Sequence, residues 1–136
     1  MASILRVNTL TDASSNNSIA TSVLFNGSAK VWINFNGTGT IATRDSYNVS
    51  SLTDNGTGQY TPAYSNNMSN DDYCATGTAD DPGTAVGVEH IPHTAASNKT
   101  SAQNMAGCTN TSGGSTDMSD YSYLVHGDLA WVKQQN

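Results

Sequence analysis

Hydrophobic and polar residues alternate with a period of two in the two clearest segments of the chain, residues 30–35 and 121–126. A period of two places the apolar side chains of a strand on one face of a sheet and the remaining side chains on the other. Both segments are therefore predicted to be β-strands. The side chains on their apolar faces, which we expect to form a core or an interface shared between chains, are Val31, Ile33, Phe35, Tyr121, Tyr123 and Val125.

Further strands are predicted where residues that favour strands flank residues that favour turns. Residues 47–52 and 59–64 are expected to form a hairpin around the glycine-rich turn at residues 53–58. A short strand is expected at residues 73–76. No segment keeps apolar residues at helical spacing over three turns, so little helix is expected.

Two Asn-Gly dipeptides, Asn26-Gly27 and Asn36-Gly37, lie on either side of the strand predicted at residues 30–35. Asn and Gly tolerate positive φ angles, and the dipeptide is typical of the tight turns that join hairpin strands. Both dipeptides are therefore predicted to be turns.

These elements predict an all-β fold, a small antiparallel sandwich-like domain of about six to eight short strands. The domain is expected at residues 23–136, with long loops across residues 77–120, where small and polar residues dominate. Residues 1–22 are expected to form an extended N-terminal arm that attaches the domain to a partner. The apolar residues of this arm are Ile4, Leu5, Val7 and Leu10.

Composition supports a folded sheet but indicates a small core. Ser, Thr, Asn and Gly supply 61 of the 136 residues, whereas Val, Leu, Ile and Phe supply 21. Low hydrophobicity leads to disorder mainly when charge density is high, and only 12% of these residues are charged. Ordering a backbone costs about 1–2 kcal/mol per residue, which a small core offsets poorly. We therefore expect the chain to self-associate as a closed homo-oligomer.

The charge balance and the ends of the chain argue against several classes of partner. Five basic residues against 11 acidic ones are too few to neutralise the phosphates of a nucleic acid. The first residues lack a basic region followed by an apolar run, so neither secretion nor membrane insertion is expected. Cys74 and Cys108 can be bridged or reduced, and reduced thiols are favoured because disulfides rarely persist in a cytosol.

Residues with catalytic or metal-binding chemistry are present without a recognisable pattern. Residues 89–93 hold one glutamate and two histidines, but not at the spacing of a zinc-binding helix. The acidic pairs at residues 71–72 and 80–81 suit calcium by ligand type, yet no calcium-binding loop is present, which leaves calcium binding open. With no nucleophile elbow either, we expect a protein that is not an enzyme and has no cofactor.

The aromatic side chains leave two alternatives open. Tyrosine and tryptophan rings can stack on sugars, and they serve equally well as packing anchors in a core or an interface. Packing is the more common role for any one of them. The eight residues concerned are Trp32, Tyr47, Tyr60, Tyr64, Tyr73, Tyr121, Tyr123 and Trp131.

Two phrases of the sequence are distinctive, Trp-x-Asn-Phe-Asn-Gly at residues 32–37 and Ser-Tyr-Asn-Val-Ser-Ser-Leu-Thr-Asp-Asn-Gly-Thr-Gly-x-Tyr-Thr at residues 46–61. With them, the chain resembles a family of virion proteins from tailed bacteriophages, particularly those of aquatic bacteria. Weaker similarity continues at residues 73–77, and residues 123–128 resemble the closing strand of the family. The resemblance covers roughly half of the chain.

The resemblance implies a structural, β-rich surface protein of the virion, trimeric and without catalytic residues. Such a protein is assembled in the cytoplasm of the bacterial host and binds other capsid or tail proteins. Family members at the end of a long fibre act in host attachment, but this chain has no repetitive shaft. That difference counts against receptor binding and favours a short fibre, a capsid decoration or an adaptor-like plug, with a host-surface glycan as an additional partner. The alternatives are a free-standing carbohydrate-binding module and an enzyme that degrades surface polysaccharide.

Overall fold

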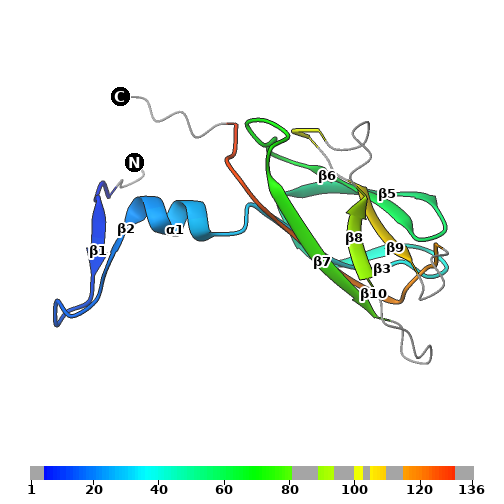
Figure 1. Cartoon of the computed structure of the whole chain (residues 1–136), viewed down its shortest axis with the longest axis horizontal. Coiled ribbons are helices and arrows are strands. Elements are labelled where there is room, and N and C mark those ends of the chain that lie inside the picture. The colour runs from blue at the N-terminus through cyan, green and yellow to red at the C-terminus, as the bar shows by residue number, and fades with distance from the viewer. Residues whose placement is uncertain (1–4, 81–88, 94–99, 103–104, 110–114, 131–136) are drawn as a thin grey trace.

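The computed structural model describes residues 5–80, 89–93, 100–102, 105–109 and 115–130. Within these residues the chain forms ten β-strands and one short helix, and every strand pair is antiparallel (Figure 1). The predicted all-β, antiparallel character of the fold is thus confirmed. The strands form a two-stranded hairpin and two four-stranded sheets.

The elements fall into three groups along the chain. The N-terminal hairpin and the helix that follows it are β1 (Thr9–Thr11), β2 (Ser18–Ala20) and α1 (Thr21–Gly27). The first sheet, in the order β4-β3-β10-β7, is formed by β3 (Val31–Asn36), β4 (Ala42–Tyr47), β7 (Cys74–Asp80) and β10 (Asp120–His126). The second sheet, in the order β5-β6-β9-β8, is formed by β5 (Val49–Gly56), β6 (Gln59–Tyr64), β8 (Glu89–His93) and β9 (Met105–Thr109).

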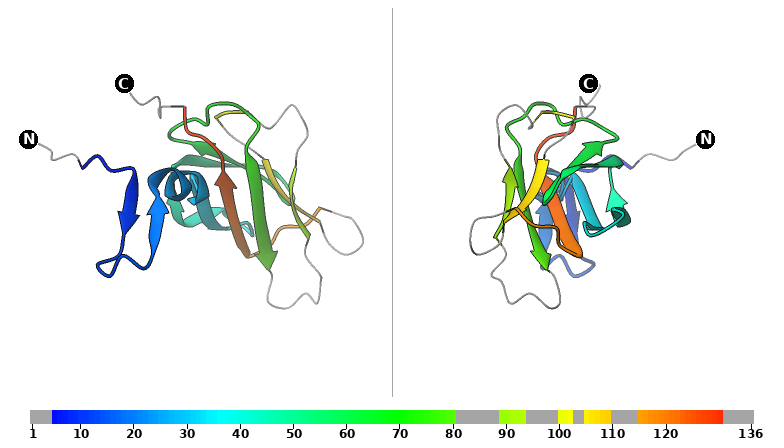
Figure 2. Two further views of the ribbon diagram at one scale, coloured as in Figure 1. Left: turned by 60° about the vertical axis from the view of Figure 1, so that its left-hand side comes forward. Right: turned by 90° about the vertical axis from the view of Figure 1, so that its right-hand side faces the viewer.

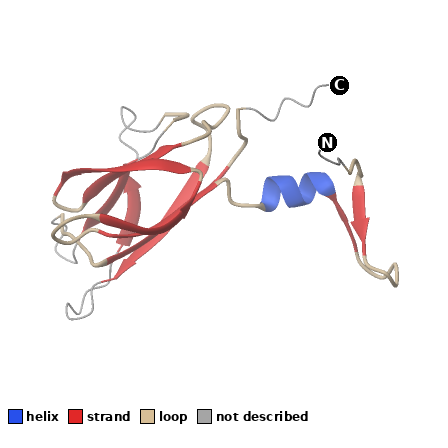
Figure 3. Ribbon diagram, turned by 180° about the vertical axis from the view of Figure 1, so that it is seen from behind, coloured by secondary structure: helices blue, strands red, loops and turns tan. Residues whose placement is uncertain are grey.

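The hairpin and α1 stand to one side of the two sheets (Figures 1 and 2). Seen from behind, α1 lies between the hairpin and the strand-rich remainder of the chain (Figure 3). We call residues 5–28 the N-terminal unit and residues 29–130 the two-sheet body.

The two strands predicted from the alternation, β3 and β10, are the central strands of the first sheet. Their register places Phe35 opposite Tyr121 and Ile33 opposite Tyr123. Cross-strand neighbours share a face, so the apolar faces of the two strands form one surface. All six side chains predicted for these faces are buried within the single chain.

An aromatic cluster joins this surface to the second sheet. The rings of Phe35 and Tyr121 stack with their centroids 4.7 Å apart. Tyr60 of β6 meets both rings edge-on, with its centroid 5.2 Å from that of Phe35 and 5.0 Å from that of Tyr121. Residues of both sheets therefore belong to one core.

The hydroxyl groups of the buried tyrosines have polar partners, as buried hydroxyls require. The hydroxyl oxygen of Tyr60 lies 2.6 Å from the carbonyl oxygen of Gly37 and 2.6 Å from Asp117 Oδ1. The hydroxyl oxygen of Tyr64 lies 3.1 Å from that of Tyr123 and 3.3 Å from that of Tyr73.

Strand β7 is longer than the sequence predicted, and this corrects the boundary of the loop region expected at residues 77–120. It continues through residues 77–80, where Gly77 pairs with Tyr123 and Ala79 pairs with Tyr121. Small residues are suited to these positions because their neighbours on β10 are large and point inward. The same small residues resemble a loop when the sequence is considered alone.

The first predicted turn, Asn26-Gly27, is wrong, because these residues are the last two of α1. The extended arm expected at residues 1–22 is also different where the structure describes it, since it contains the hairpin and the start of α1. The alternation of apolar and polar residues extends over only a few positions in this segment. Its conformation depends on the contact between the helix and the hairpin. Thr21 donates its backbone N–H to the carbonyl of Asn8 over 2.9 Å.

The turns of the other two hairpins also differ from the prediction. The connection from β3 to β4 spans residues 37–41, and its positive φ lies at Gly39 rather than in the Asn-Gly dipeptide. Strand β5 continues to Gly56, so residues 53–56 are strand, and the turn before β6 is short. Positive φ angles at Gly56 and Gly58 allow this tight reversal.

A single residue, Asn48, carries the chain from β4 in the first sheet to β5 in the second. Its φ of 58° is left-handed, a conformation that Asn tolerates better than most residues. Its side chain donates to the carbonyl oxygens of Lys30 and Asn66, each over 3.0 Å, and accepts the backbone N–H of Asn66 over 2.7 Å. The corner between the sheets is thus held by side-chain hydrogen bonds.

Replacing Gly37 by alanine should destabilise the fold. A Cβ atom at this position would lie 2.5 Å from Tyr121 Cε2 and 2.7 Å from the Tyr60 hydroxyl, closer than packed atoms allow. We expect Gly37→Ala to lower the free energy of unfolding by about 1–3 kcal/mol in urea titrations. Gly27→Ala is the matched control, because a Cβ there meets nothing within 4 Å. Equal stabilities for the two variants would contradict the close packing.

Stability should decline in alkaline solution. Burial raises the pKa of Tyr60, Tyr64 and Tyr73 above the ordinary value of 10.0. Above that pH the unfolded chain loses phenolic protons that the folded chain keeps, so the free energy of unfolding should fall. The expected slope is about 1.4 kcal/mol per pH unit for each such tyrosine, and no comparable fall is expected from these groups below pH 10.

Urea titrations between about pH 8 and pH 11, read with phenolate absorbance, measure this slope. In Tyr64→Phe the slope should be smaller by the contribution of one proton. Complete phenolate formation near pH 10 with native circular dichroism would refute the prediction.

Candidate functional site

The N-terminal unit exposes its apolar side chains and buries none of those in α1. Leu10 and Ile19 are cross-strand partners in the hairpin, and both are more than one-third exposed. Exposed apolar clusters of this kind mark surfaces that contact another molecule. The exposed apolar residues of the unit are Leu5, Val7, Leu10, Ile19, Val23, Leu24 and Phe25.

Three of the four arm residues singled out from the sequence, Leu5, Val7 and Leu10, belong to this exposed set. Ile4 lies outside the described residues. The sequence pattern missed the other members, Ile19 and the apolar residues of α1. The sequence feature that indicates the residues of α1 is the apolar run at residues 23–25. It lies directly before the Asn-Gly dipeptide that the sequence predicts to be a turn.

The turn of the hairpin is built around Asp12. Its carboxylate accepts the side-chain amide of Asn17 over 2.8 Å and the backbone N–H of Asn16 over 2.9 Å. The hydrogen bond from Asn17 lowers the pKa of Asp12 below its ordinary value, so this carboxylate is charged at neutral pH. The hairpin therefore has a well-defined turn although it has no core of its own.

Lys30 forms the junction between the N-terminal unit and the two-sheet body. The residue is buried, and its ammonium donates hydrogen bonds to the carbonyl oxygen of Phe25 at the end of α1 and to the carbonyl and hydroxyl oxygens of Ser28. The ammonium also lies 4.5 Å from the centroid of the Phe25 ring. Its backbone N–H donates to Val125 of β10 over 2.8 Å. One residue thus binds the end of the helix to the central strands of the first sheet.

The six residues proposed from the sequence as core or interface residues all lie in the core of a single chain. Val31, Phe35, Tyr121 and Val125 have no exposed surface at all. These side chains have little surface left to share with a second chain. An oligomer interface, which stays a prediction, would use other residues.

The first sheet has a second face that is directed away from the core, and we call it the outer face. Trp32 of β3 lies opposite Tyr47 of β4 and opposite Leu124 of β10, so one row of apolar side chains crosses the sheet. Trp32 is 37% exposed and Tyr47 is 51% exposed. The outer face consists of Trp32, Asn34, Arg44, Asp45, Tyr47, Thr76, Thr78, Asp120, Ser122 and Leu124.

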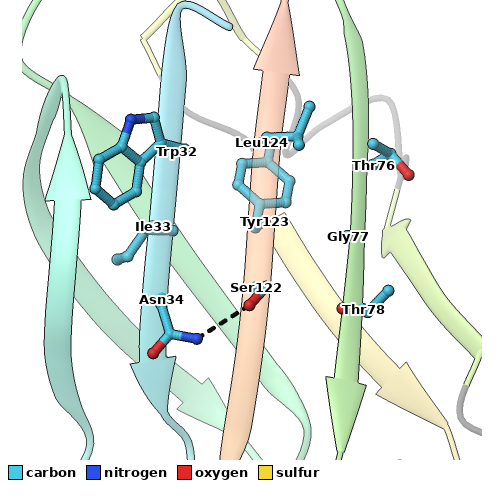
Figure 4. Close-up of a pocket in the computed structure, with 9 residues that line it drawn as sticks. All are labelled: Trp32, Ile33, Asn34, Thr76, Gly77, Thr78, Ser122, Tyr123 and Leu124. Atoms are coloured by element: carbon cyan, nitrogen blue, oxygen red, sulfur yellow. Dashed lines mark hydrogen bonds between the residues drawn. The ribbon is translucent and has the colours of Figure 1, made fainter.

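The next row of the outer face is polar and fixed by hydrogen bonds. Asn34 Nδ2 donates to Asp120 Oδ1 over 2.8 Å and to Ser122 Oγ over 3.0 Å. Arg44 donates to Asp120 Oδ2 over 2.9 Å and to Asn34 Oδ1 over 3.2 Å. Figure 4 shows this row, with Asn34, Ser122 and Thr78 beside one another below Trp32, Leu124 and Thr76. A hollow of about 290 Å³ lies over these two rows.

The structure separates the aromatic residues into two groups that the sequence left together. Five tyrosines are buried and serve as core residues, namely Tyr60, Tyr64, Tyr73, Tyr121 and Tyr123. Trp32 and Tyr47 are exposed on the outer face, where a ligand can reach them. Trp131 lies outside the described residues.

No family model, curated protein or solved structure matches the chain.

The remaining sequence candidates contribute less. In the described part of the chain, no group of three or more His, Cys, Asp and Glu side chains is placed to hold a metal ion. The side chains of residues 89–93 lie outside the described residues, as does that of Cys108, whereas Cys74 is an exposed free thiol. Within the same described residues, no helix has the length and apolar character that would let it cross a membrane.

Proposed function

We propose that this chain is a structural protein of a bacteriophage virion, a short fibre or surface decoration whose N-terminal unit docks on a capsid or tail protein. In this proposal the two sheets form a sandwich-like domain that is displayed on the particle surface. The protein has no catalytic role and acts through assembly and display.

The observation that carries the proposal is the contrast between the two parts of the chain. The two-sheet body buries its apolar residues in a core, whereas the N-terminal unit leaves seven apolar side chains exposed. Leu10 and Ile19 form a continuous apolar pair across the hairpin. Burying such a surface on a partner removes apolar area from water, which favours association. The resemblance of residues 32–37 and 46–61 to phage virion proteins supports the same function.

Homotrimer assembly is part of the proposal. It is supported by the resemblance and by the scarcity of strong core formers, five of which, Val31, Ile33, Phe35, Val125 and Leu129, are buried in the described core. Exposed apolar residues of the N-terminal unit could then be buried between copies as well as against the particle. Closed symmetric assemblies are the usual outcome of such self-association.

A free-standing carbohydrate-binding module is the second candidate. The exposure of Trp32 and Tyr47 favours it, because aromatic rings on an outer sheet face are available to a ligand. Such a module would act without a particle and without a trimer.

Deleting residues 1–27 should remove the chain from particles without unfolding the two-sheet body. We expect mass spectrometry of purified particles of the encoding phage to detect the full-length chain and to miss the truncated one. The truncated protein should lose the circular dichroism contribution of α1 and keep both the strand signal and cooperative unfolding in urea. Deleting residues 1–30 is a control that should also destabilise the two-sheet body, because it removes the hydrogen bonds that Lys30 makes with Val125 and Asn48.

Point variants refine this test. The pair Leu10→Asp and Ile19→Asp should lower incorporation, whereas the neighbouring pair Thr9→Ala and Ser18→Ala should not. A truncated body present on particles at the normal copy number would refute docking through the N-terminal unit.

The purified chain should have a mass in solution of three times the 14.2 kDa of one chain. Light scattering measures this mass directly, and the Leu10→Asp, Ile19→Asp pair shows whether the N-terminal unit takes part in the interface. A stable monomer at all concentrations would contradict trimer assembly and favour the free-standing module.

A further inference from the structure

We infer that the outer face of the first sheet binds a neutral sugar, with Trp32 and Tyr47 as the platform on which a sugar ring stacks. This inference rests on the display of the two-sheet body on the particle surface, which is part of the proposed function, and names a ligand class and a site for the displayed face. It uses no residue of the N-terminal unit, so sugar binding and docking can be tested separately.

The aromatic pair is the first observation. Trp32 and Tyr47 lie directly opposite each other on β3 and β4, and both are substantially exposed. The same chain buries five other tyrosines. Ser, Thr and Asn are abundant in this sequence and would suffice for a sheet face that is only exposed to solvent. Two aromatic rings and Leu124 in one exposed row are therefore a distinct apolar surface, of the kind that marks a binding site.

The polar row beside this platform is the second observation. Asn34 and Arg44 are held by hydrogen bonds to Asp120, so these groups are already ordered before a ligand arrives. The side chains of Trp32, Tyr47 and Thr78 have no hydrogen-bonding partner among the described residues, which leaves an indole N–H and two hydroxyls available to a ligand. A sugar ring presents an apolar face of C–H groups and a rim of hydroxyls, and this combination matches an aromatic platform next to fixed polar groups.

The charges of the outer face favour a neutral sugar over an acidic one. Arg44 is the cation of the outer face, and it forms an ion pair with Asp120 over 2.9 Å. Asp45 adds a second carboxylate, which no further cation of this face balances. A carboxylated, sulfated or phosphorylated sugar would meet excess negative charge here and across a chain with a net charge of −6. The hollow of about 290 Å³ begins at Trp32 and lies over β3, β10 and β7, and Tyr47 does not line it. Its volume is at the small end of ligand sites, which suits one or two sugar rings beside Trp32.

Tryptophan fluorescence provides a direct test, because the chain contains only two tryptophans, Trp32 and Trp131. In a Trp131→Phe variant, all tryptophan emission comes from Trp32. We expect at least one of four neutral disaccharides, maltose, cellobiose, lactose and N,N′-diacetylchitobiose, to change this emission saturably, with a dissociation constant on the order of 1 mM. Iodide quenching of Trp32 should decrease at the same sugar concentrations.

Calorimetric titration of the disaccharide that binds then assigns the site. Trp32→Ala and Tyr47→Ala should each weaken binding by about tenfold or more, whereas Tyr47→Phe should keep the affinity within about threefold because the ring is retained. Thr53→Ala on β5 is the control, since it alters an exposed side chain of the second sheet, outside both proposed surfaces, and should leave affinity unchanged. If Trp32→Ala fails to fold, the comparison of Tyr47→Ala with Tyr47→Phe still shows whether the aromatic ring at position 47 contributes to sugar binding.

Three results would overturn the inference. The first is no saturable change in Trp32 emission with any of the four disaccharides. The second is an affinity that Tyr47→Ala and Trp32→Ala leave unaltered. The third is a change in solution mass in Tyr47→Ala, which would make the outer face an interface between copies of the chain. Particle incorporation through the N-terminal unit would be unaffected by the first two results, so the two proposals fail separately.

Discussion

The contact between Phe35, Tyr121 and Tyr60 is the constraint on which the remainder of the two-sheet body depends. Phe35 and Tyr121 are adjacent in the first sheet, and Tyr60 brings the second sheet against them at ring distances of 5.2 Å and 5.0 Å. In a chain with few aliphatic residues, tyrosines supply five of the twelve buried hydrophobic residues that fill the core. Each ring also carries a hydroxyl that must be hydrogen-bonded once buried. For Tyr60, the hydrogen-bond partners of the hydroxyl are the carbonyl oxygen of Gly37 and the carboxylate of Asp117.

The same packing explains what the sequence could and could not predict. The strands β3 and β10 were predictable because their inward residues are large, apolar and spaced at every second position. The continuation of β7 could not be predicted in this way. Gly77 and Ala79 are small residues that lie opposite tyrosines of β10, more than 40 residues away in the sequence. Nothing in the local sequence around Gly77 carries that information. The α1 helix was missed for a related reason, since its apolar residues face no core and show no helical periodicity over three turns.

The candidate surfaces were predictable only in part. Leu5, Val7 and Leu10 could be singled out from the sequence, but their cross-strand and helical neighbours required the structure of the N-terminal unit. For the aromatic residues, the sequence offered a choice between packing and sugar contact without assigning either to a given ring. Register made the assignment, because it turns Tyr121 inward and Tyr47 outward. Exposure of an aromatic ring is a property of the sheet, and the residue type alone does not reveal it.

The junction at Lys30 determines how the two parts of the molecule are connected mechanically. The chain leaves α1, is held by the Lys30 ammonium, and enters β3 directly. Strand β3 lies between β4 and β10, with ladders on both sides. A pull on the N-terminal unit along β3 would load the hydrogen bonds of both ladders in parallel, as shear, and would not open them one after another. Anchoring at this end of the chain therefore transmits tension to the interior of the first sheet and not to one of its edge strands.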